Sequence, residues 1–164
     1  MISDYRSKLL ILVGEFYHSA IKLKGIYRIA LIGSLITNKE KPKDVDVLIT
    51  ISDDMDLIHL AKISRRLQGK AGGISSGADI FLTNQELQYI GRVCEWKDCR
   101  PGIRVRCDAL NCGRREYLHD DLQTITLSKE IILNPSVILF PKVKRNSIIP
   151  IDVEEELISS IEAT

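Results

Sequence analysis

The chain has 164 residues, of which 45% are hydrophobic and 27% charged, and its formal net charge is +1. This length suits one domain with a real core, and the charge excludes a general electrostatic attraction to nucleic acid or membranes. The longest apolar stretches, such as LLILV at residues 9–13, are far shorter than the ~18 residues that a membrane-spanning helix needs. LLILV is also too short for the core of a signal peptide, so we expect a cytoplasmic protein with no membrane partner.

The chain begins with a helical pattern that is followed by a strand pattern. Residues 4–24 carry apolar side chains at helical spacing, with Ser3 or Asp4 as the N-cap and Gly25 just past the end. Residues 26–32 form a short, almost continuous apolar run, which is typical of a strand buried on both faces. We therefore expect a helix and then a buried strand.

A second strand is predicted over residues 44–51, DVDVLITI. Side chains alternate along a strand, so Asp44 and Asp46 point to one side. The residues expected on the opposite side are Val45, Val47, Ile49 and Ile51.

The pattern then repeats. A second helix is predicted from a cap at Asp53 or Asp54 to about Gln68, followed by a flexible loop over residues 69–77 and a third strand over residues 78–83. This order of elements indicates an α/β (α+β) fold in which helices flank a mixed β-sheet.

The remainder of the chain differs in composition. We expect one domain over residues 1–164, with a minimal core over 1–90, a small cysteine-rich insert over 91–120 and a C-terminal part over 121–164. The C-terminal part contains two further strand patterns and one acidic amphipathic helix pattern. These lie at residues 124–127, 136–140 and 152–162. We expect the helix to pack on the body of the domain, on a second copy of the chain or on a partner protein.

Three aspartates are candidates for a metal site. Asp44 and Asp46 project from one face of their strand roughly 7 Å apart, close enough to share a divalent cation. Asp79 lies at the start of the third predicted strand, where strand pairing can bring it beside the other two. Mg²⁺ is the expected ion, because it usually binds one or two carboxylates together with substrate phosphates and water.

A candidate phosphate site lies just before the acid pair. Gly33 and Ser34 follow the first predicted strand and lead into a short helical turn, where backbone N–H groups and a hydroxyl can hold phosphate oxygens. Lys39, Lys41 and Lys43 lie between this turn and the acids, and any of them can contact a triphosphate. We include Lys43 among the nucleotide-binding residues.

In combination, these residues resemble the signature of the nucleotidyltransferase superfamily of DNA polymerase beta. The signature is a hydrophobic residue with Gly-Gly or Gly-Ser, an acid-hydrophobic-acid motif about nine to thirteen residues later, and a third acid on a later strand. The three elements here are Ile32-Gly33-Ser34, Asp44-Val45-Asp46 and Ala78-Asp79-Ile80. The resemblance covers about residues 25–83, and the second half is more loosely similar to small predicted nucleotidyltransferases of bacteria.

The resemblance implies the nucleotidyltransferase fold and an enzyme that moves a nucleoside monophosphate from a triphosphate such as ATP to an acceptor hydroxyl, with release of pyrophosphate. It implies that Asp44 and Asp46 hold two Mg²⁺ ions and that Asp79 positions or deprotonates the acceptor. Gly33 and Ser34 would hold the β- and γ-phosphates. The acceptor stays open between a small molecule, a protein and an RNA end.

Two other functions fit the same residues. One is a catalytically silent form of the fold that acts as a binding or regulatory module, for example as an antitoxin. The other is a nucleic-acid-binding protein that uses the basic cysteine-rich insert. Its relevant side chains are Trp96, Arg100, Arg104, Arg106, Arg114 and Arg115. The intact set of three acids favours the enzyme, because a pure binding module does not need it.

The four cysteines form two pairs, with four residues inside each pair and seven between the pairs. They are Cys94, Cys99, Cys107 and Cys112. Such pairs can close a tetrahedral structural zinc site, in which His119 can replace one ligand. Ordinary thiols and disulfides are the alternatives that the spacing leaves open.

Overall fold

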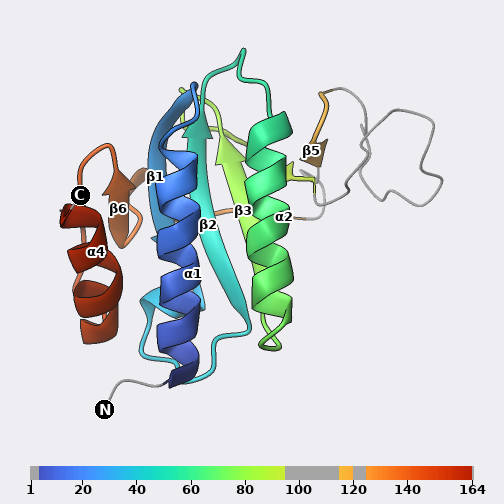
Figure 1. The fold of residues 1–164 in the computed structure, drawn as a ribbon. Coiled ribbons are helices and arrows are strands. Elements are labelled where there is room, and N and C mark those ends of the chain that lie inside the picture. Colours follow the sequence, from blue (N-terminus) through green and yellow to red (C-terminus); the bar gives the residue numbers. More distant parts are fainter. Residues whose placement is uncertain (1–3, 95–114, 120–124, 164) are drawn as a thin grey trace.

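The computed structural model describes residues 4–94, 115–119 and 125–163, which form a sheet with helices on both faces (Figure 1). The helical elements are α1 (Asp4–Ala20), the 3₁₀ turn η1 (Ser34–Ile36), α2 (Ile58–Gly72), α3 (Lys129–Leu133), the π-helical segment η2 (Val153–Ile158) and α4 (Ser159–Glu162). The strands are β1 (Ile26–Ile32), β2 (Asp44–Ile51), β3 (Gly77–Thr83), β4 (Tyr89–Val93), β5 (Leu118–His119), β6 (Val137–Phe140) and β7 (Lys144–Arg145).

The seven strands form one mixed sheet in the order β5-β4-β3-β2-β1-β6-β7. Strands β2 and β3 are parallel and are joined through α2, whereas the other described strand pairs are antiparallel. A parallel pair needs such a crossover connection, and α2 provides it. The predicted mixed α/β architecture is confirmed at this level.

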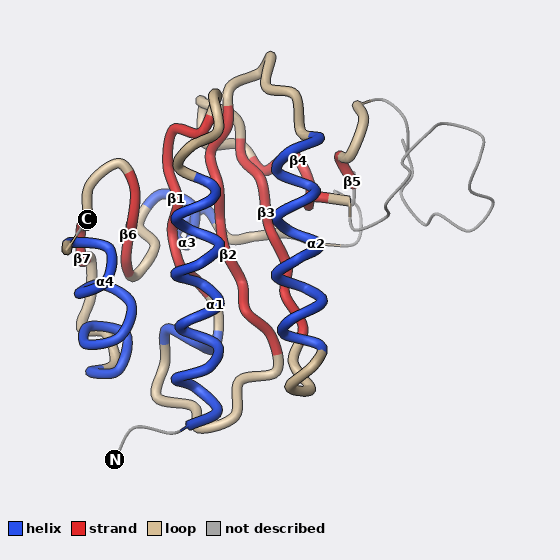
Figure 2. The backbone as a smooth tube through the Cα atoms, in the orientation of Figure 1, coloured by secondary structure: helices blue, strands red, loops and turns tan. Residues whose placement is uncertain are grey.

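The main core lies between the sheet and helices α1, α2 and η2–α4, which cover one face of the sheet (Figures 1 and 2). The alternation predicted for β2 is correct, because its four apolar residues pointing this way are fully buried. They are Val45, Val47, Ile49 and Ile51. Each buried aliphatic side chain contributes about 1.5–3 kcal/mol, so this face dominates the stability of the fold.

The opposite face, here called the α3 face, has a smaller apolar cluster. Its buried members are Ala30, Ile32, Leu48, Phe81 and Ile132. Leu48 follows Asp44 and Asp46 at alternate positions of β2, so both aspartates also belong to the α3 face. The acids therefore occupy the less covered side of the sheet.

The first half of the chain follows the predicted order of elements, with three displaced boundaries. Helix α1 ends at Ala20 rather than at residue 24, and residues 21–25 form turns before β1. Helix α2 begins at Ile58 rather than at Asp53 or Asp54, because the Asp56 carboxylate accepts the N–H of Ile58 at 3.0 Å and forms a local turn. The helix also continues through Gly69 to Gly72, where the predicted loop had begun. Neither glycine has a neighbour that would obstruct a side chain, so nothing in the packing stops the helix there.

The second half was predicted less well. Strand β4 pairs with β3, so residues 91–93 belong to the sheet and not to a separate cysteine-rich insert. Residues 125–127 are not a strand, and residue 124 lies outside the described residues. The strand predicted over residues 136–140 is present as β6. The C-terminal helical segment packs on the main core, which is one of the three alternatives left open by the sequence.

Among the described residues, no helix combines the length and the apolar character needed to cross a membrane.

Candidate active site

Strand pairing brings the three predicted acids to one place on the α3 face. In the parallel β2–β3 pair, Asp46 lies directly beside Asp79, and Asp44 lies beside Gly77. Asp44 is two residues before Asp46, so it projects from the same face of β2. The third acid therefore lies beside the pair, as the sequence predicted.

Two glycines make room for these carboxylates. Gly33, which follows β1, has φ +81°, and a Cβ atom there would overlap with the Asp46 carboxylate. A Cβ atom at Gly77 would overlap with the Asp44 carboxylate in the same way. Gly33 was predicted as a site residue for its approach to phosphate, whereas Gly77 was assigned to a loop. Gly77 matters because it pairs with Asp44 in the sheet, and the sequence alone does not show which residues of β2 and β3 pair.

The electrostatics of the site centre on Asp46. Its pKa is raised from 3.8 to about 7, first by burial and then by the neighbouring charges of Asp79 and Asp44. Ionised carboxylates packed this closely repel one another, and burial removes the water that would otherwise screen them. The site therefore favours a bound cation or a proton at Asp46.

A cation of the chain already contacts the third acid. Arg92 on β4 donates from Nη1 to Asp79 Oδ1 at 2.9 Å, and both side chains are about one-third exposed (28% and 32%). Arg92 reaches Asp79 because it pairs with Phe81, which lies on the α3 face two residues after Asp79. Arg92 was not among the residues predicted from the sequence, because β4 itself was not predicted.

The predicted phosphate site forms the turn between β1 and β2. Gly33 is exposed, Ser34 is half-buried, and η1 follows them directly, as expected for a short helical turn. The carbonyl of Ser34 accepts hydrogen bonds from the backbone N–H of Thr37 at 3.1 Å and from its hydroxyl at 2.6 Å. These bonds close the turn and leave the Gly33 end open to solvent.

The three predicted lysines follow this turn as exposed side chains. They are Lys39, Lys41 and Lys43. Only the backbone of Lys43 is anchored to β3, because its carbonyl accepts from the N–H of Gly77 at 2.9 Å and from the hydroxyl of Ser76 at 2.9 Å. The structure thus fixes the backbone of Lys43 next to the acids, with the residue exposed to solvent.

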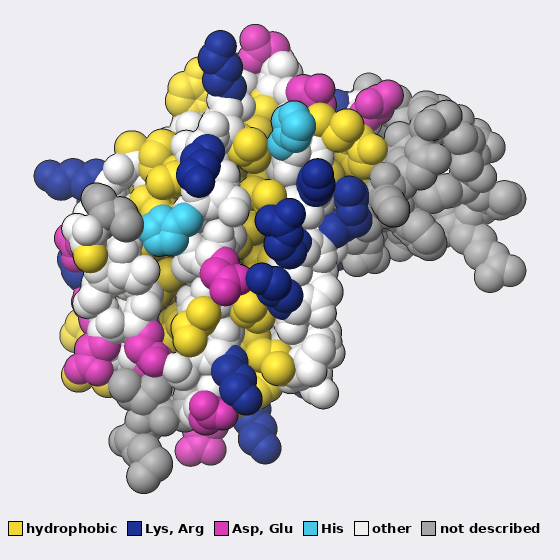
Figure 3. Space-filling model, in the orientation of Figure 1, with side chains coloured by type: hydrophobic (Ala, Val, Ile, Leu, Met, Phe, Trp, Pro, Cys, Tyr) yellow, Lys and Arg dark blue, Asp and Glu magenta, His cyan; other side chains and the backbone are white. Residues whose placement is uncertain are grey.

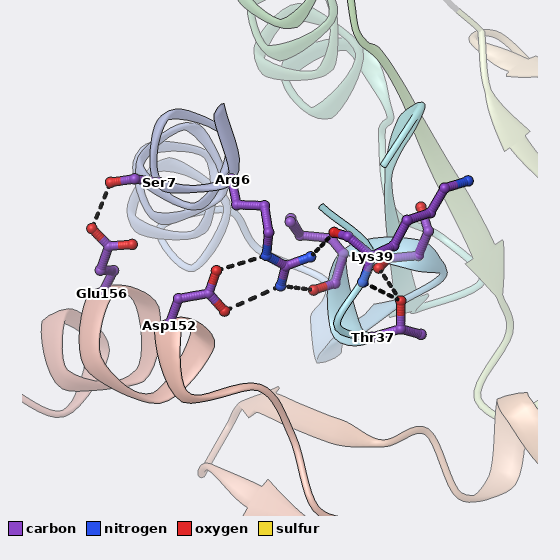
Figure 4. Close-up of polar contacts among 8 residues, drawn as sticks. Arg6, Ser7, Thr37, Lys39, Asp152 and Glu156 are labelled. Atoms are coloured by element: carbon purple, nitrogen blue, oxygen red, sulfur yellow. Dashed lines mark hydrogen bonds and ion pairs between the residues drawn. The ribbon is translucent and has the colours of Figure 1, made fainter. Parts of the chain in front are cut away.

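A buried arginine holds the turn in place from behind (Figure 4). Arg6 of α1 is 4% exposed, and its guanidinium donates to the backbone carbonyls of Leu35 at 2.8 Å and Lys39 at 2.7 Å. The same guanidinium forms a two-point ion pair with Asp152, at 2.7 Å and 3.1 Å. Both ends of the turn are thereby tied to α1 and to the C-terminal segment.

Removing one partner from a buried ion pair typically costs about 3–5 kcal/mol, because the other charge is left without compensation. Arg6 and Asp152 are therefore strong constraints on the turn, even though neither faces the carboxylates. Neither residue stands out in the sequence, because Arg6 lies in an ordinary amphipathic pattern and its partner is 146 positions away.

The three aspartates can be compared with the ligands that a bound metal ion requires. No group of three or more Asp, Glu, His or Cys side chains in the described part of the chain is arranged to hold a metal ion, and Asp79 is engaged by Arg92. Asp44 and Asp46 remain as two adjacent carboxylates with a repulsion that a cation would relieve. Two carboxylates suit Mg²⁺, which completes its coordination with phosphate and water.

The zinc prediction concerns residues that the structure describes only in part. Cys94 is buried at the end of β4, and its N–H donates to the carbonyl of Tyr117 at 2.7 Å. Cys99, Cys107 and Cys112 lie outside the described residues, as do Trp96 and the arginines at 100, 104, 106 and 114. His119 is described and half-buried, on β5. The zinc site stays a prediction.

Comparison with known proteins does not add a relative: no protein-family model matches the chain, and no curated protein or solved structure matches it significantly.

Proposed function

We propose that this protein is a Mg²⁺-dependent nucleotidyltransferase of the DNA polymerase beta type, which moves a nucleoside monophosphate from a triphosphate to an acceptor hydroxyl. The observation that carries the proposal is the juxtaposition of Asp44, Asp46 and Asp79 on one sheet face, directly beside the Gly33 turn. The sequence signature consists of three separate segments, around Gly33, Asp46 and Asp79, and these segments lie side by side in the fold.

The turn would hold the nucleotide. Backbone N–H groups near Gly33 and the hydroxyl of Ser34 are available to the β- and γ-phosphates, and the absence of a side chain at Gly33 permits close approach. Lys43 directly precedes β2 and is exposed, and its ammonium group would neutralise part of the triphosphate charge.

The acids would serve the reacting end. Asp44 and Asp46 would hold Mg²⁺, which would offset the negative charge on the oxygens of the α-phosphate and of the departing pyrophosphate. Asp79 would accept the proton of the acceptor hydroxyl as its oxygen bonds to the α-phosphorus and the bond to pyrophosphate breaks. The ion pair with Arg92 keeps the Asp79 carboxylate oriented between these events.

The test is transfer of label. The protein is incubated with each α-labelled nucleoside triphosphate, Mg²⁺ and a cell extract as the source of acceptors. We expect label to enter an acceptor, and we expect Asp44→Ala with Asp46→Ala to reduce transfer by about 100-fold or more.

The matched control is Asp53→Ala with Asp54→Ala, which removes the same charge from two exposed residues beyond β2. This control should transfer label at the wild-type rate. The absence of any transfer or triphosphate binding that depends on Asp44 and Asp46 would contradict the proposal.

A second candidate is a nucleotide-binding module without catalysis. It is favoured by one observation, the engagement of Asp79 by Arg92. The same experiment distinguishes the two, because the module would bind Mg²⁺ and triphosphate through Asp44 and Asp46 but would transfer no label.

A further inference from the structure

A second polar site lies on the α3 face at the far end of β1. It is a pocket of about 520 Å³ between the start of β1 and the turn that joins β6 to β7. We call it the basic pocket, and its main lining residues are Tyr27, Arg28, Ile138, Pro141, Lys142 and Lys144. It contains three cationic residues and no acidic one.

The cations of the basic pocket differ from three other arginines that the structure describes. Arg6, Arg92 and Arg145 are each paired with a carboxylate. Among the described residues, Arg28, Lys142 and Lys144 form no ion pair.

The Arg28 side chain is the most constrained of the three. Its Nη2 donates to the carbonyl of Ile132 on α3 at 2.7 Å, while its buried Nε has no hydrogen-bond partner among the described residues. A buried donor without a partner costs about 1–3 kcal/mol. The three cations of the lining, with no acid among them, make the pocket complementary to an anion.

The other lining groups indicate the body of the ligand. Tyr27 is an aromatic residue with 50% of its surface exposed, and Ile138 and Pro141 supply apolar contact. An aromatic side chain beside cations is the usual arrangement for a base and its phosphate, because the ring stacks on the base while the cations pair with the phosphate. The chemistry thus favours a nucleotide over a simple anion.

The basic pocket shares a sheet face with the acids. Arg28 pairs with Thr50, and Ile32 pairs with Asp46, so the two sites are four residues apart along β1. At about 3.3 Å per residue, this separation is roughly 13 Å. About four stacked nucleotides of a strand cover that length at 3.4 Å each.

We propose that the basic pocket binds a phosphate and base of the acceptor, which is a nucleotide, either free or within the end of a single nucleic-acid strand. The acceptor role depends on the proposed nucleotidyl transfer, whereas the binding does not. The pocket gives the acceptor a place on the α3 face that is separate from the triphosphate.

Binding is therefore measured without Mg²⁺ or triphosphate, with fluorescent adenosine 5′-monophosphate and with a fluorescent single-stranded oligoribonucleotide at low salt. We expect Lys142→Gln with Lys144→Gln to weaken binding by about tenfold or more, and wild-type binding to fall as salt rises. The matched control is Lys22→Gln with Lys62→Gln, which removes two exposed lysines elsewhere and should bind as wild type.

Additional measurements distinguish binding at the basic pocket from the proposed nucleotidyl transfer. Asp44→Asn with Asp46→Asn should keep the binding, because the acids are not part of the basic pocket. Tighter binding of the strand assigns a nucleic-acid end as acceptor, and tighter binding of the monophosphate assigns a free nucleotide. The proposal is wrong if neither ligand binds, if the Lys142 and Lys144 variant binds as wild type, or if unphosphorylated adenosine competes as well as the monophosphate.

Discussion

Gly33 is where the two halves of the candidate site touch, since it lies in the phosphate turn and also against the Asp46 carboxylate. Its φ of +81° is a conformation that other residues adopt only with strain. The requirement for glycine is thus both conformational and steric. A Gly-Ser dipeptide can be recognised in the sequence, but its contact with Asp46 depends on the pairing of β1 with β2.

Gly33→Ala should lower the free energy of unfolding by about 1–3 kcal/mol, from strain and overlap with Asp46, and should also abolish triphosphate binding at the turn. Chemical denaturation and equilibrium binding measure the two effects. Gly69→Ala is the control, because its position in α2 has open space and alanine should stabilise the helix by about 0.5–1 kcal/mol. An unchanged free energy of unfolding in the Gly33 variant would contradict this prediction, because it would mean that Asp46 moves away from the new methyl group without destabilising the fold.

Asp46 makes the stability of the protein depend on pH. The pKa of Asp46 is about 7 in the folded protein and near 3.8 when the group is unperturbed, as in an unfolded chain. Between these values the folded state binds more protons than the unfolded state, so this group lowers the free energy of unfolding as pH rises from about 4 to about 7. The penalty is fully present above the folded pKa.

Asp46→Asn should therefore raise the midpoint of thermal unfolding at pH 8, measured without Mg²⁺, and this gain should disappear by pH 4. The reason is that asparagine cannot acquire the charge that burial and the other acids disfavour. Asp53→Asn, at an exposed position, should show no such dependence on pH. An equal shift of the Asp46 variant at both pH values would mean that the repulsion is not its cause.

At the scale of elements, the phosphate turn is held by parts of the chain that are remote from it. Arg6 contacts the carbonyls of Leu35 and Lys39, and its ion pair with Asp152 joins the turn to the segment that begins η2. The elements themselves were predictable where hydrophobic periodicity is strong, as in α1, β2 and the C-terminal helix. Strand β4 contains a glycine at its centre and an arginine on one face, so it has little of the periodicity that marks β2.

Arg6→Lys should weaken triphosphate binding by about tenfold, since one ammonium group cannot replace the four hydrogen bonds of the guanidinium. Ser7→Ala is the matched control. Ser7 binds Glu156 at 2.5 Å and so joins the same helix to the same C-terminal segment, but it does not contact the turn.

Equilibrium binding and thermal unfolding are measured on both variants. Both changes should lower the unfolding midpoint, whereas only Arg6→Lys should change nucleotide affinity. If the two variants lose affinity in proportion to their loss of stability, Arg6 has no specific role in positioning the turn.

At the scale of the whole molecule, the net charge of +1 conceals local concentrations of like charge. Lysine and arginine side chains gather over α2 on the α1 and α2 side (Figure 3), and α2 contains four such residues and no acid. The three aspartates lie on the other side, on the α3 face. Composition alone does not reveal these concentrations, because they depend on which face each residue occupies.

The cysteine-rich part of the chain leads to a prediction about the metal content and the stability of the whole protein. If its four cysteines hold a structural zinc ion, metal analysis of the purified protein should give about one zinc per chain, and removal of the ion should lower the unfolding midpoint. The Cys94→Ser variant should lose the zinc. A folded, metal-free protein would instead favour ordinary thiols or disulfides.

The contact between Arg6 and Asp152 also bears on the order in which the protein is made. A ribosome produces α1 and the phosphate turn well before residue 152, at about 5–20 residues per second. Until Asp152 emerges, a chain that buried Arg6 would carry an uncompensated charge, so the native packing of the turn is unfavourable in every shorter nascent chain. The candidate nucleotide site would thus become competent only after nearly all of this sequence has been synthesised.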